Sequence, residues 1–215
     1  MNFIFGSANG IGKSLYRFYK KNNYDVFGFD KDSSNTTDFV IDLSTDINTS
    51  EAINIINKEK IDSLTYTAGI QNGENIESIY NVNVLSFIKI IKNTISNYDE
   101  TAICAISSVH AISSNYQNLE YSSSKASLEA AIKSFSTKGL NSFFYFLRLG
   151  ATETNLLKNN VKDLEKLKKD LPSGNLFQPD DVAALIFDIN TNHKRLMNGG
   201  FIQVDQGVLS RLSTE

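Results

Sequence analysis

Tyr121 and Lys125 stand four positions apart in a segment whose apolar residues recur at helical spacing. Positions i and i+4 share one face of a helix, so we expect the phenol and the ammonium group to be neighbours. A nearby positive charge lowers the pKa of a tyrosine from its usual value of about 10, and the tyrosine can then act as an acid or base near neutral pH. The alternative interpretation is structural: a half-buried ring beside a solvated lysine.

A glycine-rich loop follows the first apolar run and opens the first helical segment. The free N–H groups at the start of a helix attract phosphate. Gly6, Gly10 and Gly12 fit the three tasks of glycine in a dinucleotide site: a tight turn, close approach of the pyrophosphate, and packing of helix on strand. The Gly-Lys-Ser ending at residues 12–14 also suggests a P-loop, but Ser7 stands where that motif needs its first glycine. A turn without a ligand is the remaining alternative.

Asp30 ends the second apolar run, about twenty residues beyond the glycine loop. A carboxylate at this place can accept hydrogen bonds from both ribose hydroxyls of an adenosine and repels a 2′-phosphate. This favours NAD(H) over NADP(H), although Lys13 and Lys31 are nearby cations that argue the other way. Asp30 is alternatively a turn residue at the start of the polar stretch 30–35.

Short apolar runs alternate with longer helical segments, a pattern typical of βαβ units and a parallel sheet. We expect strands at residues 3–6, 25–29, 39–41, 63–67, 102–106, 142–149 and 201–204. We expect helices at residues 11–22, 49–58, 75–96, 119–136 and 180–190. Residues 31–38 are too few for a helical crossover, which needs roughly 10–12 residues, so this second crossover helix is predicted to be missing. The sequence thus predicts one α/β domain, residues 1–215, with a doubly wound, Rossmann-type parallel sheet of about seven strands.

The composition argues against several classes of function. Lys and Arg number 21 against 24 Asp and Glu, so the chain has no basic surplus for nucleic acid or an anionic membrane. No apolar run approaches the roughly 18–20 residues of a membrane span. Cys104, the one cysteine, permits no disulfide within the chain and is expected to be a buried small side chain. No group of His, Cys, Asp and Glu residues has the spacing of metal ligands. Without a secretion signal before the first strand, we expect a cytoplasmic protein with no metal site.

The order of the motifs gives the Tyr121 and Lys125 pair a context. Ser108 follows the predicted fifth strand, at the sheet edge where ligands gather in parallel α/β folds. The glycine loop, the acidic end of the second strand, this serine and the Tyr-x-x-x-Lys pair together resemble the short-chain dehydrogenase/reductase family, from Phe3 to about Gly207. The resemblance implies hydride transfer between a nicotinamide cofactor and a small alcohol or ketone.

The resemblance also implies a role for each matching residue. Tyr121 matches the catalytic acid/base, and Lys125 matches the residue that binds the nicotinamide ribose and lowers the pKa of that tyrosine. Ser108 matches the hydroxyl that holds the substrate oxygen, and Asn83 the asparagine that anchors a water in a proton relay. The residues expected to bind the cofactor are Gly6, Ser7, Asn9, Gly10, Ile11, Gly12, Asp30, Asp42, Leu43, Ala68, Gly69, Tyr121, Lys125, Thr152 and Thr154.

Some positions match the two ends of the cofactor and others depart from the family pattern. Asp42 and Leu43 resemble the pair that contacts the adenine ring, and Thr154 resembles the threonine on the nicotinamide carboxamide. Tyr66 and Thr67 replace the two asparagines of the Asn-Asn-Ala-Gly turn beside the cofactor. The hydrogen bonding of that turn must therefore be rebuilt.

Residues 153–174 place leucines at near-helical spacing among lysines and acids. This segment is either a mobile lid over a substrate pocket with hydrophobic walls or a solvated helix docked by its apolar stripe. Ala126, Ala130 and Ala131 permit close approach of the helix after Tyr121. The resemblance implies that such helices pair between subunits, in a homodimer or homotetramer.

We therefore expect an NAD(H)-dependent oxidoreductase that interconverts a secondary alcohol and a ketone on a small or medium-sized metabolite. One alternative is a reductase or epimerase for sugars or sugar nucleotides, which normally has a longer C-terminal region than the few residues after Gly207. Another is a non-catalytic dinucleotide sensor, which is expected to lack Tyr121 or Lys125. His110 either lines the substrate pocket or makes a polar contact.

Overall fold

The computed structural model describes residues 1–73 and 75–211 and contains one parallel sheet, in the order β3-β2-β1-β4-β5-β6-β7. The strands are β1 (Asn2–Phe5), β2 (Val26–Asp30), β3 (Phe39–Val40), β4 (Ile61–Tyr66), β5 (Tyr98–Ser108), β6 (Ser142–Leu149) and β7 (Phe201–Val204). The chain starts in the middle of the sheet, runs outward to β3, and returns to β4 on the other side of β1. This confirms the predicted doubly wound, Rossmann-type α/β fold.

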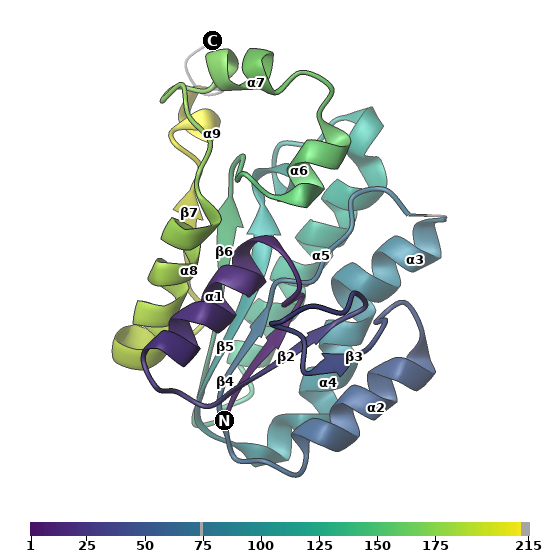
Figure 1. Cartoon of the computed structure of the whole chain (residues 1–215), viewed down its shortest axis with the longest axis vertical. Helices are drawn as coiled ribbons and strands as arrows, with labels where there is room; N and C mark the ends of the chain where they lie inside the picture. The colour runs from purple at the N-terminus through teal and green to yellow at the C-terminus, as the bar shows by residue number, and fades with distance from the viewer. Residues whose placement is uncertain (74, 212–215) are drawn as a thin grey trace.

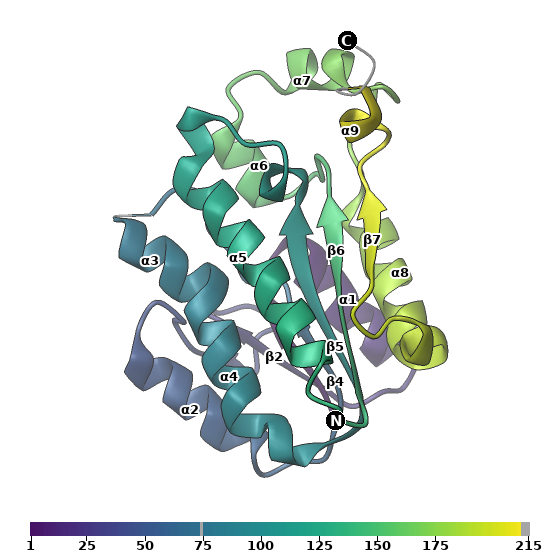
Figure 2. The ribbon, with the colours of Figure 1, turned by 180° about the vertical axis from the view of Figure 1, so that it is seen from behind.

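Helices cover both faces of the sheet. They are α1 (Gly10–Lys21), α2 (Asp46–Ile56), α3 (Ile76–Tyr80), α4 (Ser86–Thr94), α5 (Leu119–Ser136), α6 (Asn155–Asn160), α7 (Leu164–Asp170), α8 (Pro179–Asp188) and α9 (Val208–Arg211). α1 and α8 lie side by side on one face (Figure 1), whereas α2, α4 and α5 cover the other (Figure 2). α6, α7 and α9 lie beyond the carboxyl ends of β5, β6 and β7. In the described part of the chain, no helix is long and apolar enough to cross a membrane.

Both faces of the sheet are apolar, which explains why the strand sequences lack a polar alternation. Successive strand residues point to opposite faces. Phe3 and Phe5 belong to a buried cluster that includes residues of α2, α4 and α5, whereas Ile4 packs in a second cluster with Leu15 of α1 and Ile186 of α8. Two apolar layers therefore hold the sheet and leave its carboxyl-end edge free for polar residues.

The short connection 31–38 contains no helix, as predicted. A Cβ atom on Gly28 would lie 2.1 Å from the carbonyl oxygen of Thr36, so the segment packs directly against β2. Asp38 accepts a hydrogen bond from the Gly28 N–H at 2.8 Å, and the Thr36 hydroxyl donates to the Ser7 carbonyl at 2.7 Å. The connection is thus tied both to the strand and to the glycine loop.

Two helical predictions differ from the structure. The helix predicted at residues 75–96 is interrupted between α3 and α4 by a π-helical turn, Asn81–Leu85. The stretch 153–173 forms two short helices instead of one. A new helix begins at Asp163, whose carboxylate accepts a hydrogen bond from the Lys166 N–H at 2.9 Å, because aspartate is a favourable N-cap residue.

Candidate active site

The glycine loop joins β1 to α1 at the carboxyl-end edge of the sheet. Gly6 (φ +90°) and Gly10 (φ +53°) have left-handed backbone conformations that favour glycine. A Cβ on Gly12 would lie 2.1 Å from the Gly6 carbonyl oxygen, so α1 packs directly on the loop. Asn9 gives α1 no side-chain cap, and the first turn contains no acidic residue. The positive end of α1 can therefore bind an anion such as a pyrophosphate.

Ser7, predicted to contact a cofactor, is fully buried within this loop. Its N–H donates to the Phe29 carbonyl at 3.2 Å, and its carbonyl accepts from the Thr36 hydroxyl. Ser7 therefore shapes the loop and presents no exposed atom to a ligand. Asn9, by contrast, is exposed beside the start of α1.

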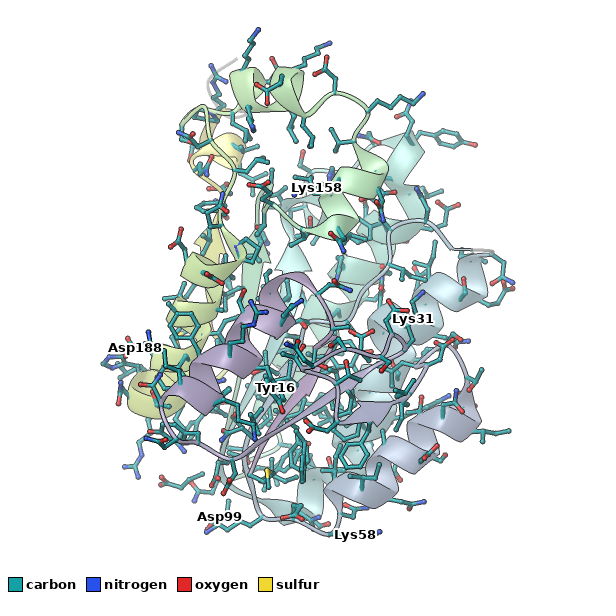
Figure 3. The ribbon with its side chains drawn as sticks, viewed as in Figure 1. Tyr16, Lys31, Lys58, Asp99, Lys158 and Asp188 are labelled. Atoms are coloured by element: carbon teal, nitrogen blue, oxygen red, sulfur yellow. The ribbon has the colours of Figure 1, made fainter. Side chains whose placement is uncertain are left out.

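Asp30 is half-buried at the carboxyl end of β2. One carboxylate oxygen accepts from the Ala8 N–H at 2.9 Å, and the other accepts from the Asp32 N–H at 3.0 Å. Each oxygen has a further lone pair for a ligand hydroxyl. Lys31, labelled in Figure 3, is exposed at the surface directly after the strand. The glycine loop thus orients the Asp30 carboxylate through the Ala8 N–H. The negative charge of Asp30 is fixed by hydrogen bonds, whereas Lys31 is exposed to solvent.

The remaining predicted cofactor residues follow the ends of other strands at the same edge. These residues are Asp42, Leu43, Ala68, Gly69, Thr152 and Thr154. A Cβ on Gly69 would lie 3.2 Å from Lys125 Nζ, so glycine makes room for the lysine. A Cβ on Gly10 would lie 3.0 Å from Thr154 Cγ2, which places this threonine against the glycine loop. Leu43 is buried in the core, so its side chain serves packing.

Tyr121, Ser108 and Lys125 meet where β5 ends and α5 begins. All three side chains are buried, and the Ser108 hydroxyl is near enough to that of Tyr121 to lower its pKa. Lys125 Nζ donates to the Ile106 carbonyl at 2.9 Å and lies 5.7 Å from the centre of the Tyr121 ring. His110 donates its backbone N–H to Ser108 Oγ at 3.2 Å, and its ring lies 6.1 Å from that of Tyr121.

Burial is the largest influence on the pKa values of Tyr121 and Lys125. Burial raises the pKa of Tyr121 to about 12, although the hydrogen bond from Ser108 lowers it. Burial also lowers the pKa of Lys125 to about 8. The lowered tyrosine pKa expected from the Tyr-x-x-x-Lys spacing therefore does not follow from the lysine alone, because loss of solvation outweighs the attraction of one charge.

Asn83 lies in the π-helical turn and is fully buried. Its Oδ1 accepts from the Ile70 N–H at 2.8 Å, and its Nδ2 lies 2.9 Å from both the Ile70 carbonyl and Ser124 Oγ. The asparagine thus joins the loop after β4 to α5, one residue from Lys125. Its side-chain amide is used within the protein, so it orients the site through these two segments.

Comparison with known proteins identifies the family to which this chain belongs. The family model described as enoyl-(acyl carrier protein) reductase matches residues 6–209. The chain belongs to the short-chain dehydrogenase/reductase family. It is therefore an oxidoreductase of a family whose members use a nicotinamide dinucleotide.

The relatives of this dehydrogenase/reductase cover nearly its whole length. It is 24% identical to a 3-oxoacyl-(acyl-carrier-protein) reductase of Rickettsia felis, over 97% of this chain and 96% of that protein. A short chain dehydrogenase family protein from Francisella tularensis has the same fold, with a TM-score of 0.90 and 21% identity over 97% and 98% of the two chains. A short chain dehydrogenase from Burkholderia cenocepacia in complex with NADP gives a TM-score of 0.85 and 17% identity over 95% and 96%.

The two departures from the family turn have new partners in this dehydrogenase/reductase. The Tyr66 hydroxyl donates to the Val82 carbonyl, inside the π-helical turn that carries Asn83. The Thr67 hydroxyl lies 2.8 Å from the Phe5 carbonyl oxygen and 3.0 Å from that of Gly6, and so holds the glycine loop. The sequence indicated that these bonds had to be rebuilt but gave no signal for the partners.

A buried ion pair beside the site was not predicted. Glu129 of α5 accepts from Arg148 of β6 at 2.6 and 3.0 Å, and from the Ser107 hydroxyl at 2.7 Å. The guanidinium group also stacks over the Phe201 ring, 4.5 Å from its centre. One available signal was the arginine within the apolar run 142–149, because a charge in a buried strand needs a partner.

The segment 153–176 leaves and returns to the sheet edge at one point. The Glu153 N–H donates to the Phe177 carbonyl at 2.8 Å, and the Phe177 N–H donates to the Ala151 carbonyl at 3.0 Å. Between these points, α6 and α7 contain no buried side chain. Lys158 on α6, labelled in Figure 3, pairs with Glu153 at 3.0 Å. The segment is therefore fixed at its base, and beyond the base Leu171 and Leu176 are its buried residues.

Two amide contacts join α6 to the rest of the site. Asn155 Nδ2 donates to Asn9 Oδ1 of the glycine loop at 3.2 Å. Asn160 at the other end of α6 accepts a hydrogen bond from Asn72 in the loop after β4. α6 thus spans from the glycine loop to the segment that precedes α3.

Proposed function

We propose that this protein is an NAD(H)-dependent oxidoreductase that interconverts a secondary alcohol and a ketone on a small or medium-sized metabolite, with Tyr121 as acid/base. The observation that carries the proposal is the buried group of Tyr121, Ser108 and Lys125 at the sheet edge. A phenol and a serine hydroxyl that lie near each other can each donate a hydrogen bond to a substrate oxygen. A protein that only sensed a dinucleotide would not need Tyr121, Ser108 and Lys125 together.

The bound dinucleotide supplies the hydride acceptor or donor. In the oxidation direction, the Tyr121 oxygen takes the hydroxyl proton of the substrate while the carbinol C–H bond breaks and hydride leaves, so the alcohol loses two electrons and becomes a ketone. Ser108 donates a hydrogen bond to the oxygen that carries charge. Lys125, held by the Ile106 carbonyl, and the positive charge of the oxidised nicotinamide both oppose the effect of burial on the pKa of Tyr121.

The preference for NAD(H) rests on Asp30. Its carboxylate is oriented by the Ala8 and Asp32 N–H groups and keeps lone pairs for ribose hydroxyls. A 2′-phosphate there would meet a fixed negative charge. The cation that follows, Lys31, lies on an exposed position and is free to move away from the site.

We also propose that residues 153–174 form a lid and that the enzyme is a homodimer or homotetramer. The paired base at Ala151 and Phe177 and the weak burial of α6 and α7 support the lid. Ala126 and Ala130 lie exposed on α5, where a second copy can approach closely. Light scattering of the wild type and of Ala130→Arg tests the assembly: a loss of mass in the variant is expected if α5 pairs, and an unchanged oligomer argues against it.

The cofactor assignment is tested by titrating the protein with NADH and NADPH and following nicotinamide fluorescence, with no tryptophan in the chain to interfere. We expect NADH to bind at least tenfold more tightly than NADPH. Asp30→Ala should remove most of that difference. If neither nucleotide binds, the proposal fails at its first step.

The acid/base role is tested with Tyr121→Phe. We expect turnover to fall by about 10²–10⁴-fold, the range for general acid/base groups, while the Kd for NADH changes less than threefold. Tyr116→Phe is the matched control, because Tyr116 is 86% exposed and lies a few residues earlier. Retained turnover in Tyr121→Phe would remove Tyr121 from the mechanism.

A further inference from the structure

A cavity opens directly beside Tyr121, between the loop after β4 and the start of α5. Its volume is about 220 Å³, below the roughly 300–1,000 Å³ of common ligand pockets. Five of the side chains that line it carry amides: Gln71, Asn72, Asn75, Gln117 and Asn118. The pocket is therefore polar, and the hydrophobic walls suggested by the leucines of residues 153–174 are not found here.

The charges around this pocket exclude one class of substrate. Among the described residues that line it, Glu120 contributes the one ionisable carboxylate, and none is a lysine, arginine or histidine. Phosphate and carboxylate groups are recognised by cations or by several converging N–H groups. An anionic substrate would meet no counter-charge and one repelling carboxylate. A neutral substrate is thus favoured.

The amides favour hydroxyl groups over an acyl chain. A side-chain amide has both donors and acceptors, and a hydroxyl group also donates and accepts. An aliphatic chain in the pocket would displace water from these amides without replacing its hydrogen bonds, at a cost for each unpaired group. Ile76 and Ile79 supply a smaller apolar side against which a carbon skeleton can pack.

One amide pair is already held in place. Gln71 Nε2 donates to Asn118 Oδ1 at 2.9 Å, which links the loop after β4 to the residue before α5. Among the residues that the structure describes, no side-chain or backbone group bonds Gln71 Oε1 or Asn118 Nδ2, so both remain for a ligand. A pre-formed acceptor and donor at a fixed separation suit two neighbouring hydroxyls of one molecule.

We propose that the substrate is a small, neutral polyhydroxylated compound, a polyol or free sugar, and that Gln71 and Asn118 select it. This inference rests on the proposed function, because it assumes that Tyr121 exchanges a proton with one hydroxyl or carbonyl of that compound. The other hydroxyls of the compound would bond the amides.

The test is a substrate panel for the whole enzyme with NAD⁺ or NADH. It contains neutral C4–C6 polyols and sugars, their phosphorylated and carboxylated counterparts, simple aliphatic ketones and a 3-oxoacyl thioester. We expect kcat/KM for at least one neutral polyol or sugar to exceed that of every other class by tenfold or more. A higher value for an anionic compound, an aliphatic ketone or the thioester overturns the inference.

Variants make the assignment specific. Gln71→Leu and Asn118→Leu should each lower kcat/KM for the preferred polyol at least tenfold, mainly through KM, and leave the Kd for NADH within threefold. Asn192→Leu is the matched control, because Asn192 is an exposed amide that bonds Asp188 at the far end of α8. NADH binding without turnover of any neutral polyol or sugar contradicts this inference alone, whereas absence of NADH binding contradicts the proposed function.

Discussion

The hydroxyl of Tyr66 donates a hydrogen bond of 2.5 Å to the carbonyl oxygen of Val82. The two residues lie on β4 and in the π-helical turn before α4. In that turn the Ser86 N–H bonds the Asn81 carbonyl, five residues back, instead of that of Val82, four residues back. Tyr66 and the Ser86 hydroxyl bond the Val82 oxygen instead. Tyr66 thus stabilises the turn that carries Asn83, one of the proposed site residues.

Removing this hydroxyl should weaken both catalysis and folding. Tyr66→Phe keeps the ring and loses the bond to Val82, so the turn around Asn83 is less well held. We expect kcat to fall about tenfold with the Kd for NADH unchanged, and the free energy of unfolding to fall by about 1–2 kcal/mol. Steady-state kinetics, NADH titration and urea unfolding measure the three effects.

Tyr98 offers a matched control for that variant. Tyr98 is buried at the start of β5, and its hydroxyl lies 2.7 Å from that of Thr94. Both residues are more than ten positions after Asn83 in the sequence. Tyr98→Phe should lose a similar amount of stability and keep kcat. Equal losses of kcat in both variants would mean that Tyr66 acts only through overall stability.

Gly12→Ala should disrupt the cofactor site. The added Cβ would lie 2.1 Å from the Gly6 carbonyl oxygen and 2.5 Å from Thr67 Oγ1, so the loop must move. We expect the affinity for NADH to fall at least tenfold in a fluorescence titration. Gly139→Ala is the control: its φ of +72° strains alanine by about 1–2 kcal/mol, but among the described residues, its two chain neighbours aside, no heavy atom lies within 4 Å of the added Cβ. Unchanged NADH affinity in Gly12→Ala would contradict the packing described.

The buried pair of Glu129 and Arg148 should behave as a unit. Glu129→Gln leaves the guanidinium without its counter-charge, at a cost of about 3–5 kcal/mol in the free energy of unfolding. The double variant Glu129→Leu with Arg148→Met removes both charges and should recover much of that loss. Urea unfolding of Glu129→Leu, of Arg148→Met and of the double variant measures the coupling. Additive costs would show that the pair contributes no interaction energy.

The lowered pKa of Lys125 predicts a pH dependence of stability. In the folded protein this pKa is about 8, against 10.5 for the unfolded chain, so between these values the unfolded state binds more protons. The free energy of unfolding of the wild type should therefore rise with pH through this window, by up to about 3 kcal/mol, relative to Lys125→Met. Urea unfolding of both proteins between pH 7 and 10 measures the difference. A difference that stays flat or falls would contradict the assignment.

The sequence by itself determined the order of the elements and the residues proposed for the chemistry. Short apolar runs without polar alternation predicted the seven strands. The eight residues 31–38 are too few for a crossover helix, and the structure has none there. The same pattern predicted Ser108 just after a strand, and Gly12 and Tyr121 near the starts of the helices that follow the first and fifth strands. These features depend on local spacing along the chain, so they can be read without the fold.

The tertiary structure alone decided which side chains hold the site together. The Thr67 hydroxyl bonds the carbonyl oxygens of Phe5 and Gly6, which lie more than sixty positions away in the sequence. The π-helical turn that carries Asn83 accepts a hydrogen bond from Tyr66 of strand β4. The tertiary structure also decided the titration of Tyr121, where burial outweighs the charge of Lys125. Local spacing brings a phenol and an ammonium together, but only packing determines how much water each of them loses, and that loss sets the larger part of their pKa values.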